Sequence, residues 1–123
     1  MPFRFLSRRM LVAGALTLVP PPRHAAAHAI LEASEPANGA QLPSGPIVLK
    51  LRYNSRIDRA RSGLSLTRPD HTKVAVPIDP EGPPDLLTAK VTLTPGAYVA
   101  HWQVLAIDGH ITRGDVTFAV TGP

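Results

Sequence analysis

The sequence of 123 residues contains no cysteine, and its two methionines, Met1 and Met10, both stand near the start of the chain. The absence of cysteine excludes disulfides, zinc–thiolate sites and blue-copper centres, because the last of these need a thiolate ligand. After residue 27 the sequence has no sulfur atom at all. A metal site in that part of the chain must therefore use nitrogen and oxygen ligands. The length is enough for at most one domain.

Residues 28–123 also carry no excess of positive or negative charge. The whole sequence has 13 basic and nine acidic residues, a formal net charge of +4. Four of the basic residues lie in residues 1–27, so nine basic residues balance nine acidic ones in residues 28–123. The charge therefore gives no reason to expect a nucleic acid or an anionic membrane as a partner.

Residues 1–27 have the composition of an export signal peptide. A basic start, a short apolar run and a small-residue cleavage site follow one another: Arg4, Arg8 and Arg9, then 11–19, then 25–27. The apolar run is too short to span a bilayer, which takes about 20 residues. The pair Arg8-Arg9 also fits a twin-arginine signal, and an uncleaved membrane anchor remains an alternative. Cleavage after Ala27 would give an exported chain that begins at His28, whereas cleavage after Ala29 would remove that histidine.

The remainder of the sequence predicts short strands and no helix. Apolar and polar residues alternate in 46–53 and 86–93, which is the period of a half-buried strand. Clusters of proline, glycine and aspartate mark loops between the strands, and the polar stretch 54–61 is expected to be a solvated loop. About seven strands result, at a spacing typical of an antiparallel Greek-key sandwich or small barrel: a short run after residue 28, then 46–53, 63–67, 73–78 (an edge strand, or the end of one, because of Pro77), 86–93, 98–107 and 116–120.

The longest apolar strand carries the only tryptophan, Trp102, and ends in Asp108-Gly109-His110. Successive side chains of a strand point to opposite sides, so one face is expected to hold Tyr98, Ala100, Trp102, Val104 and Ala106. We expect this strand to be central. Asp108 and His110 would project to the same side, and Gly109 lets the backbone turn. Two ligands do not make a metal site, and a polar turn with an incidental histidine fits these residues too.

Three motifs span the chain from residue 28 onward. The first, H-A-x-L-x-x-S-x-P-A-x-G-x-x-L, begins at His28 and ends at Leu42. The second, P-G-x-Y-x-x-x-W followed by D-G-H, runs from Pro95 to His110, and the third, G-x-x-x-F-x-V, starts at Gly114. Together they resemble the CopC family of periplasmic copper-resistance proteins.

The resemblance implies an immunoglobulin-like β-barrel, formed by residues 28–123, that binds one Cu(II) ion near its N-terminus. The implied ligands are the amine and imidazole of His28, together with Asp108 and His110. The implied function is sequestration or delivery of Cu(II) in periplasmic copper homeostasis and resistance, without catalysis, and the implied partner is an inner-membrane copper transporter of the CopD type. We expect a monomer. Family members that also bind Cu(I) use a methionine-rich loop, which residues 28–123 lack.

This ligand set suits Cu(II) on chemical grounds. The amine and imidazole of a terminal histidine close a chelate ring, His110 adds a third nitrogen and Asp108 an oxygen. Such tetragonal nitrogen and oxygen sets favour Cu(II), which also has the highest affinity among divalent first-row ions. The amine, with an ordinary pKa of about 7.7–8.0, must lose its proton to bind, so affinity should rise with pH through that range. Without sulfur ligands, Cu(I) should bind weakly.

Two other functions stay open at this point. A terminal histidine and a second histidine also form the histidine-brace site of copper oxygenases that cleave polysaccharides, although Asp108 would occupy a position that oxygen needs. In a non-metal immunoglobulin-like interaction module, His28 and His110 would be coincidental. Of the other histidines after residue 27, we expect His71 to be exposed in a turn and His101 to be structural. Glu32 is a candidate neighbour of the site.

Overall fold

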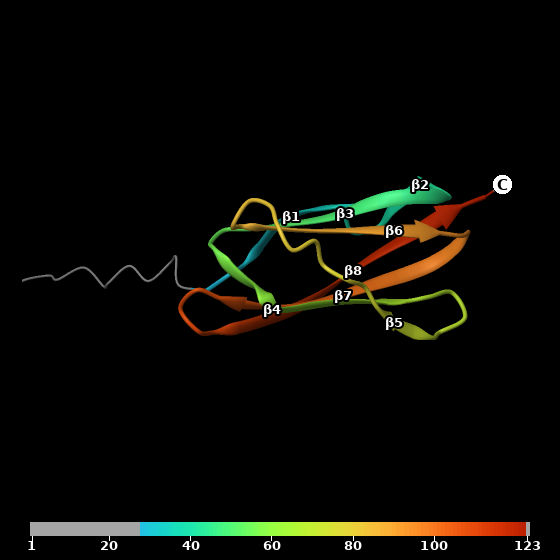
Figure 1. The fold of residues 1–123 in the computed structure, drawn as a ribbon. Helices are drawn as coiled ribbons and strands as arrows, with labels where there is room; N and C mark the ends of the chain where they lie inside the picture. Colours follow the sequence, from blue (N-terminus) through green and yellow to red (C-terminus); the bar gives the residue numbers. More distant parts are fainter. Residues whose placement is uncertain (1–27, 123) are drawn as a thin grey trace, which may run out of the picture.

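The computed structural model describes residues 28–122; the predicted signal peptide, residues 1–27, lies outside the described residues. Eight strands in the described part form two facing sheets, with no helix among them (Figure 1). One sheet has the order β1-β3-β6 and the other β2-β8-β7-β4-β5. The all-β, two-sheet sandwich predicted from the sequence is confirmed. The strands are β1 (Leu31–Glu35), β2 (Ala40–Pro43), β3 (Gly45–Tyr53), β4 (Ile57–Thr67), β5 (Lys73–Ala75), β6 (Leu86–Leu93), β7 (Gly96–Ala106) and β8 (Ile111–Thr121).

Strand β7 is central, as predicted, because β4 and β8 pair with it antiparallel on its two sides. The face predicted to be buried is buried: each of its five side chains is at most 8% exposed. Across the sandwich, the ring centroid of Tyr53 lies 5.3 Å from that of Trp102, edge to face. This aromatic contact joins the two sheets. It also places the end of β7, and the motif that follows it, at the rim of a rigid core.

Several strand predictions differ from the structure. Strand β5 ends at Ala75, before Pro77, and not at residue 78, and β8 begins at Ile111, ahead of the predicted 116–120. Strand β2 is an eighth strand that the sequence does not predict, because four residues ending in Pro43 have too short an alternation to be recognised. It pairs in parallel with β8. Strand β4 begins at Ile57 and not at Gly63, so the second half of the expected loop 54–61 is strand. Its pairing with β7 shifts register between Asp58 and Gly63, which marks a β-bulge. Arg61 in this stretch is exposed, whereas Arg59 is half-buried and donates to the carbonyls of Pro83 and Leu86.

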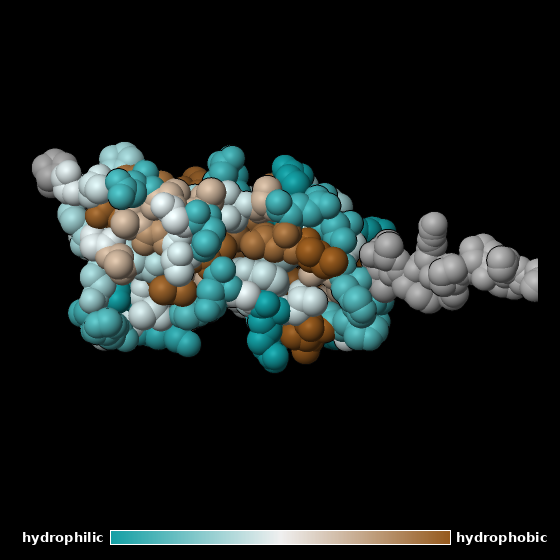
Figure 2. Space-filling view, turned by 180° about the vertical axis from the view of Figure 1, so that it is seen from behind, coloured by the Kyte–Doolittle hydropathy of each residue, from teal (hydrophilic) through white to brown (hydrophobic). Residues whose placement is uncertain are grey.

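The outer surface is mixed, as expected of strands with alternating side chains. Figure 2 shows one face, with hydrophilic side chains over much of it and small hydrophobic patches between them. The large hydrophobic side chains that are exposed in the described part are Ile30, Val48, Ile107 and Ile111. None of the described residues form a helix that is long and apolar enough to cross a membrane.

The core has no room for a side chain at Gly114, and this gives a first testable prediction. A Cβ at this position would lie 2.5 Å from a ring carbon of Trp102, so Gly114→Ala should destabilise residues 28–123 by about 1–3 kcal/mol. The control is Gly63→Ala on β4, where an added Cβ has no atom within 4 Å; it should change stability by less than about 0.5 kcal/mol. Urea unfolding measures both. Equal stability of the two variants would contradict the packing explanation.

Candidate metal centre

A tight hairpin turn carries the motif Asp108-Gly109-His110 between β7 and β8. The amide of Gly109 donates to the carbonyl of Ala106 at 2.9 Å, and the amide of Ala106 donates to the carbonyl of His110 at 2.8 Å. Gly109 has a φ of 91°, in the left-handed region that favours glycine. The turn holds both polar side chains at the end of the sandwich.

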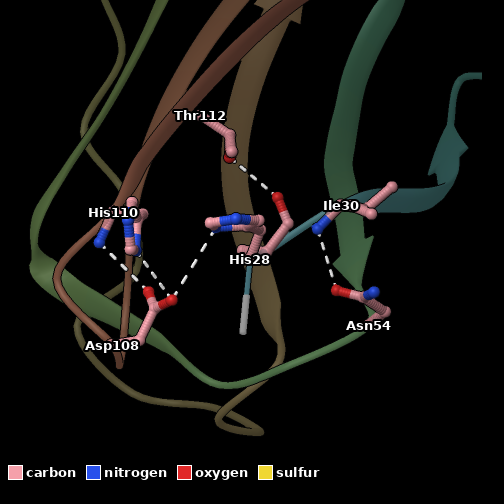
Figure 3. A network of polar contacts seen from close by, with 7 residues as sticks. His28, Ile30, Asn54, Asp108, His110 and Thr112 are labelled. Carbon is pink, nitrogen blue, oxygen red and sulfur yellow. Dashed lines mark hydrogen bonds and ion pairs between the residues drawn. The ribbon is translucent and has the colours of Figure 1, made fainter. Parts of the chain in front are cut away.

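Asp108 and His110 form a close pair within this turn (Figure 3). One carboxylate oxygen of Asp108 accepts the backbone N–H of His110 at 3.0 Å, and the other lies 2.8 Å from its Nδ1. The backbone N–H is the main cause that lowers the pKa of Asp108 below its usual value; partial desolvation opposes it, and the side chain of His110 adds to the lowering. Asp108 is therefore ionised at neutral pH. The Nδ1 of His110 and the nearby carboxylate oxygen of Asp108 are close enough to be neighbouring ligands of one ion when Nδ1 carries no proton.

His28, the first of the described residues, lies beside the pair formed by Asp108 and His110. Its Nδ1 lies 3.7 Å from the carboxylate of Asp108, and its ring centroid lies 4.4 Å from that of His110 at an interplanar angle of 86°. The imidazoles of His28 and His110 are 53% and 63% exposed, and the side chain of Asp108 is 23% exposed. The structure thus brings the three predicted residues together at a site that is open to solvent.

The donor atoms of these three side chains are close enough to share one ion. One donor atom from each of His28, Asp108 and His110 lies within 4.8 Å of the other two. Two imidazole nitrogens and a carboxylate oxygen are ligands that suit a divalent transition metal. In the 123-residue chain, the backbone nitrogen of His28 is an amide bonded to Ala27. Cleavage at that bond would turn it into a fourth donor, an amine.

The other predicted candidates lie elsewhere. His101 bonds through Nε2 to the hydroxyl of Thr67 at 2.8 Å and through Nδ1 to Asp115 at 2.7 Å, so it is a satisfied structural histidine on β7. His71 is exposed in a turn, with a φ of 72°. Both predictions are confirmed. Glu32 is exposed on β1 and is not part of the group of three.

Sequence reasoning missed two residues that support the site, Asn54 and Thr112. The hydroxyl of Thr112 donates to the carbonyl of Ala29 at 2.8 Å. The side-chain oxygen of Asn54 accepts the amide of Ile30 at 2.8 Å. Nothing in the sequence pattern distinguishes this asparagine and threonine from other polar residues, because their partners are 24 and 83 positions away.

Comparison with known proteins identifies the relatives of this chain. The family model described as the CopC domain matches residues 31–121. The chain belongs to the CopC family. Protein YobA of Escherichia coli (strain K12) is 30% identical over 98 residues, which cover 76% of this chain and 79% of that protein. Copper resistance protein C of Xanthomonas campestris pv. juglandis is 30% identical over 103 residues, which cover 76% of this chain and 80% of that protein.

Solved structures of CopC proteins have the same fold. CopC from Methylosinus trichosporium OB3b superposes with a TM-score of 0.69 at 27% identity, covering 77% of this chain and 95% of that one. PcoC from Escherichia coli, described as a methionine-rich copper resistance protein, has a TM-score of 0.64 at 24% identity, covering 77% and 100%. The CopC-family chain described here has no methionine after residue 10. The two chains thus share the sandwich fold and differ in their methionine content.

Proposed function

We propose that residues 28–123 form an exported copper-binding protein that holds one Cu(II) ion between His28, Asp108 and His110. The observation that carries this proposal is the approach of three donor side chains, from the N-terminal segment and from the turn between β7 and β8, to within 4.8 Å of one another. The family relationship supports copper as the metal, since one relative is named copper resistance protein C. The family match begins at residue 31, so the role of His28 rests on its geometry and chemistry.

The donor set favours Cu(II) over other divalent ions. The mature N-terminus would add its amine to the imidazole of His28, so the ion would have up to three nitrogens and one carboxylate oxygen around it. This combination suits the tetragonal geometry of Cu(II), whose affinity for such ligands exceeds that of Zn(II). Titration of residues 28–123 with Cu(II) and with Zn(II) tests the proposal. One equivalent of tightly bound Cu(II) is expected. If the protein takes up no Cu(II), the result would favour the alternative, a non-metal interaction module.

A binding function fits this site better than catalysis. The carboxylate of Asp108 lies beside both imidazoles, where an oxygenase would need an open position for oxygen. The ligands are exposed, so copper can be exchanged directly with another protein. We therefore propose sequestration or delivery of Cu(II) in the periplasm by a monomer, with a membrane copper transporter of the CopD type as its partner. Peroxide-driven cleavage of a polysaccharide by the copper-loaded protein would contradict this proposal in favour of an oxygenase.

The oxidation state of the bound copper gives a second prediction. The chain offers no cysteine or methionine after residue 27, and soft sulfur ligands are what Cu(I) prefers. Competition with a chromogenic Cu(I) chelator should therefore detect no Cu(I) binding of an affinity comparable to that for Cu(II). Tight Cu(I) retention by residues 28–123 would require ligands other than those proposed.

A further inference from the structure

The two residues after His28 are attached to both sheets of the sandwich (Figure 3). From the five-stranded sheet, the hydroxyl of Thr112 on β8 donates to the carbonyl of Ala29 at 2.8 Å. From the three-stranded sheet, Asn54, which follows β3, accepts the amide of Ile30 at 2.8 Å through its side chain. The backbone amide of Asn54 returns a hydrogen bond to the carbonyl of Ile30 at 3.0 Å.

The regular pairing of β1 with β3 does not include residues 29 and 30, which one backbone bond, from Asn54 to Ile30, joins to the end of β3. Pairing of β1 with β3 begins at Leu31 and shifts register before Ala33. A chain terminus is poorly ordered unless it is tied down, and cleavage after Ala27 would make His28 the terminus. The side chain of Ala29 is fully buried, so this residue is inserted into the core directly beside His28. The bonds from Thr112 and Asn54 hold the carbonyl and the amide of one peptide group, the one that joins Ala29 to Ile30.

We propose that Thr112 and Asn54 position His28 as a ligand by holding residues 29–30 between the two sheets before the metal arrives. This inference rests on the proposed copper site. Ordering a backbone costs conformational entropy, and a segment that is ordered by folding does not pay that cost when it binds the ion. These hydrogen bonds of the two side chains go to the backbone of residues 29 and 30, so they act through the chain that carries His28.

Thr112 is suited to this task by its place on β8. It is half-buried, whereas its neighbours Ile111 and Arg113 are exposed, so its side chain faces the interior, where the carbonyl of Ala29 lies. Removal of the hydroxyl would leave that carbonyl without its side-chain donor. Valine has nearly the same shape as threonine without the hydroxyl, so Thr112→Val removes the hydrogen bond and keeps the packing. Thr112→Ser keeps the hydroxyl and loses a methyl group.

The test compares these variants in residues 28–123, which contain all eight strands. Thr112→Val should weaken Cu(II) binding by about three- to tenfold, the effect of one hydrogen bond, and Thr112→Ser should stay within about twofold of the wild type. The matched control is Thr117→Val on the same strand, because the hydroxyl of Thr117 donates to Asn38 at 3.1 Å and not to the segment beside His28. It should leave the copper affinity unchanged.

Asn54→Ala tests the other sheet independently and should also weaken Cu(II) binding by about three- to tenfold. In the metal-free protein, hydrogen exchange of the Ile30 amide should become faster in Asn54→Ala and in Thr112→Val, but not in Thr117→Val. Wild-type affinity in both Thr112→Val and Asn54→Ala would overturn the positioning role, as would an equal loss in Thr117→Val. If the wild-type protein itself fails to bind Cu(II), the proposed function is wrong.

Discussion

One extra glycine before His28 is expected to lower the Cu(II) affinity of the mature protein by several orders of magnitude. The extension converts the terminal amine into a peptide amide, whose nitrogen has no available lone pair for Cu(II) at neutral pH unless its proton is displaced. The chelate ring between that nitrogen and the imidazole of His28 is then lost. The copper site would therefore be completed only by cleavage of the signal peptide, and copper loading should follow export.

The structure separates the contribution of the amine from that of the side chains. In the 123-residue chain the imidazoles of His28 and His110 already lie together with Asp108, although the nitrogen of His28 is bonded to Ala27. The extended protein should therefore keep two imidazoles and one carboxylate, and its Cu(II) EPR spectrum should show one nitrogen ligand fewer. The bonds from Thr112 and Asn54 to residues 29–30 do not involve the added residue.

Two variants serve as controls for the extension. A glycine added after Pro123 changes the length equally and should leave the copper affinity unchanged. His28→Ala keeps the terminal amine and removes the imidazole, so it measures the other half of the chelate; a glycine added at the N-terminus of that variant should then have a much smaller effect. Unchanged affinity and an unchanged spectrum in the extended wild-type protein would mean that the amine is not a ligand.

The fold was predictable where the sequence alternates regularly. Strand β6 has the predicted bounds, Leu86–Leu93, and the buried face of β7 is the predicted one. Prediction failed where tertiary pairing decides the structure. Strand β2 exists because it pairs in parallel with β8, and the polar start of β4 is held as a bulged strand by β7. Neither of these pairings leaves a periodic pattern in the sequence.

The candidate site was only partly predictable from the residues. Asp108 and His110 are two positions apart, so their proximity follows from local geometry. His28 is 80 positions before Asp108, and no spacing rule connects them; the family resemblance supplied that connection. Thr112 and Asn54 could not be found from the sequence, because their hydrogen bonds depend on where the N-terminal segment crosses between the sheets.

Removal of the imidazole of His110 is expected to cost more copper affinity than removal of the carboxylate of Asp108. His110 would supply an imidazole nitrogen directly to the ion, and His110→Ala should lower the affinity by about 100-fold or more, beyond the 10–100-fold typical of residues that only support a ligand. Asp108→Ala should have a smaller effect, because a water molecule can take the place of one oxygen ligand. Part of this smaller effect would come from losing the two contacts by which Asp108 orients His110.

A second histidine–aspartate pair in the same sheet provides the matched control. His101 and Asp115 lie 2.7 Å apart on β7 and β8, and neither belongs to the group at the end of the sandwich. His101→Ala and Asp115→Ala should therefore leave the Cu(II) affinity within about twofold of the wild type, as expected for sites that share no partner. Thermal unfolding of the metal-free variants should show that His110→Ala and Asp108→Ala keep the fold, since both residues lie in an exposed turn. Equal copper losses for His110→Ala and Asp108→Ala, or collapse of either metal-free variant, would count against the assigned roles.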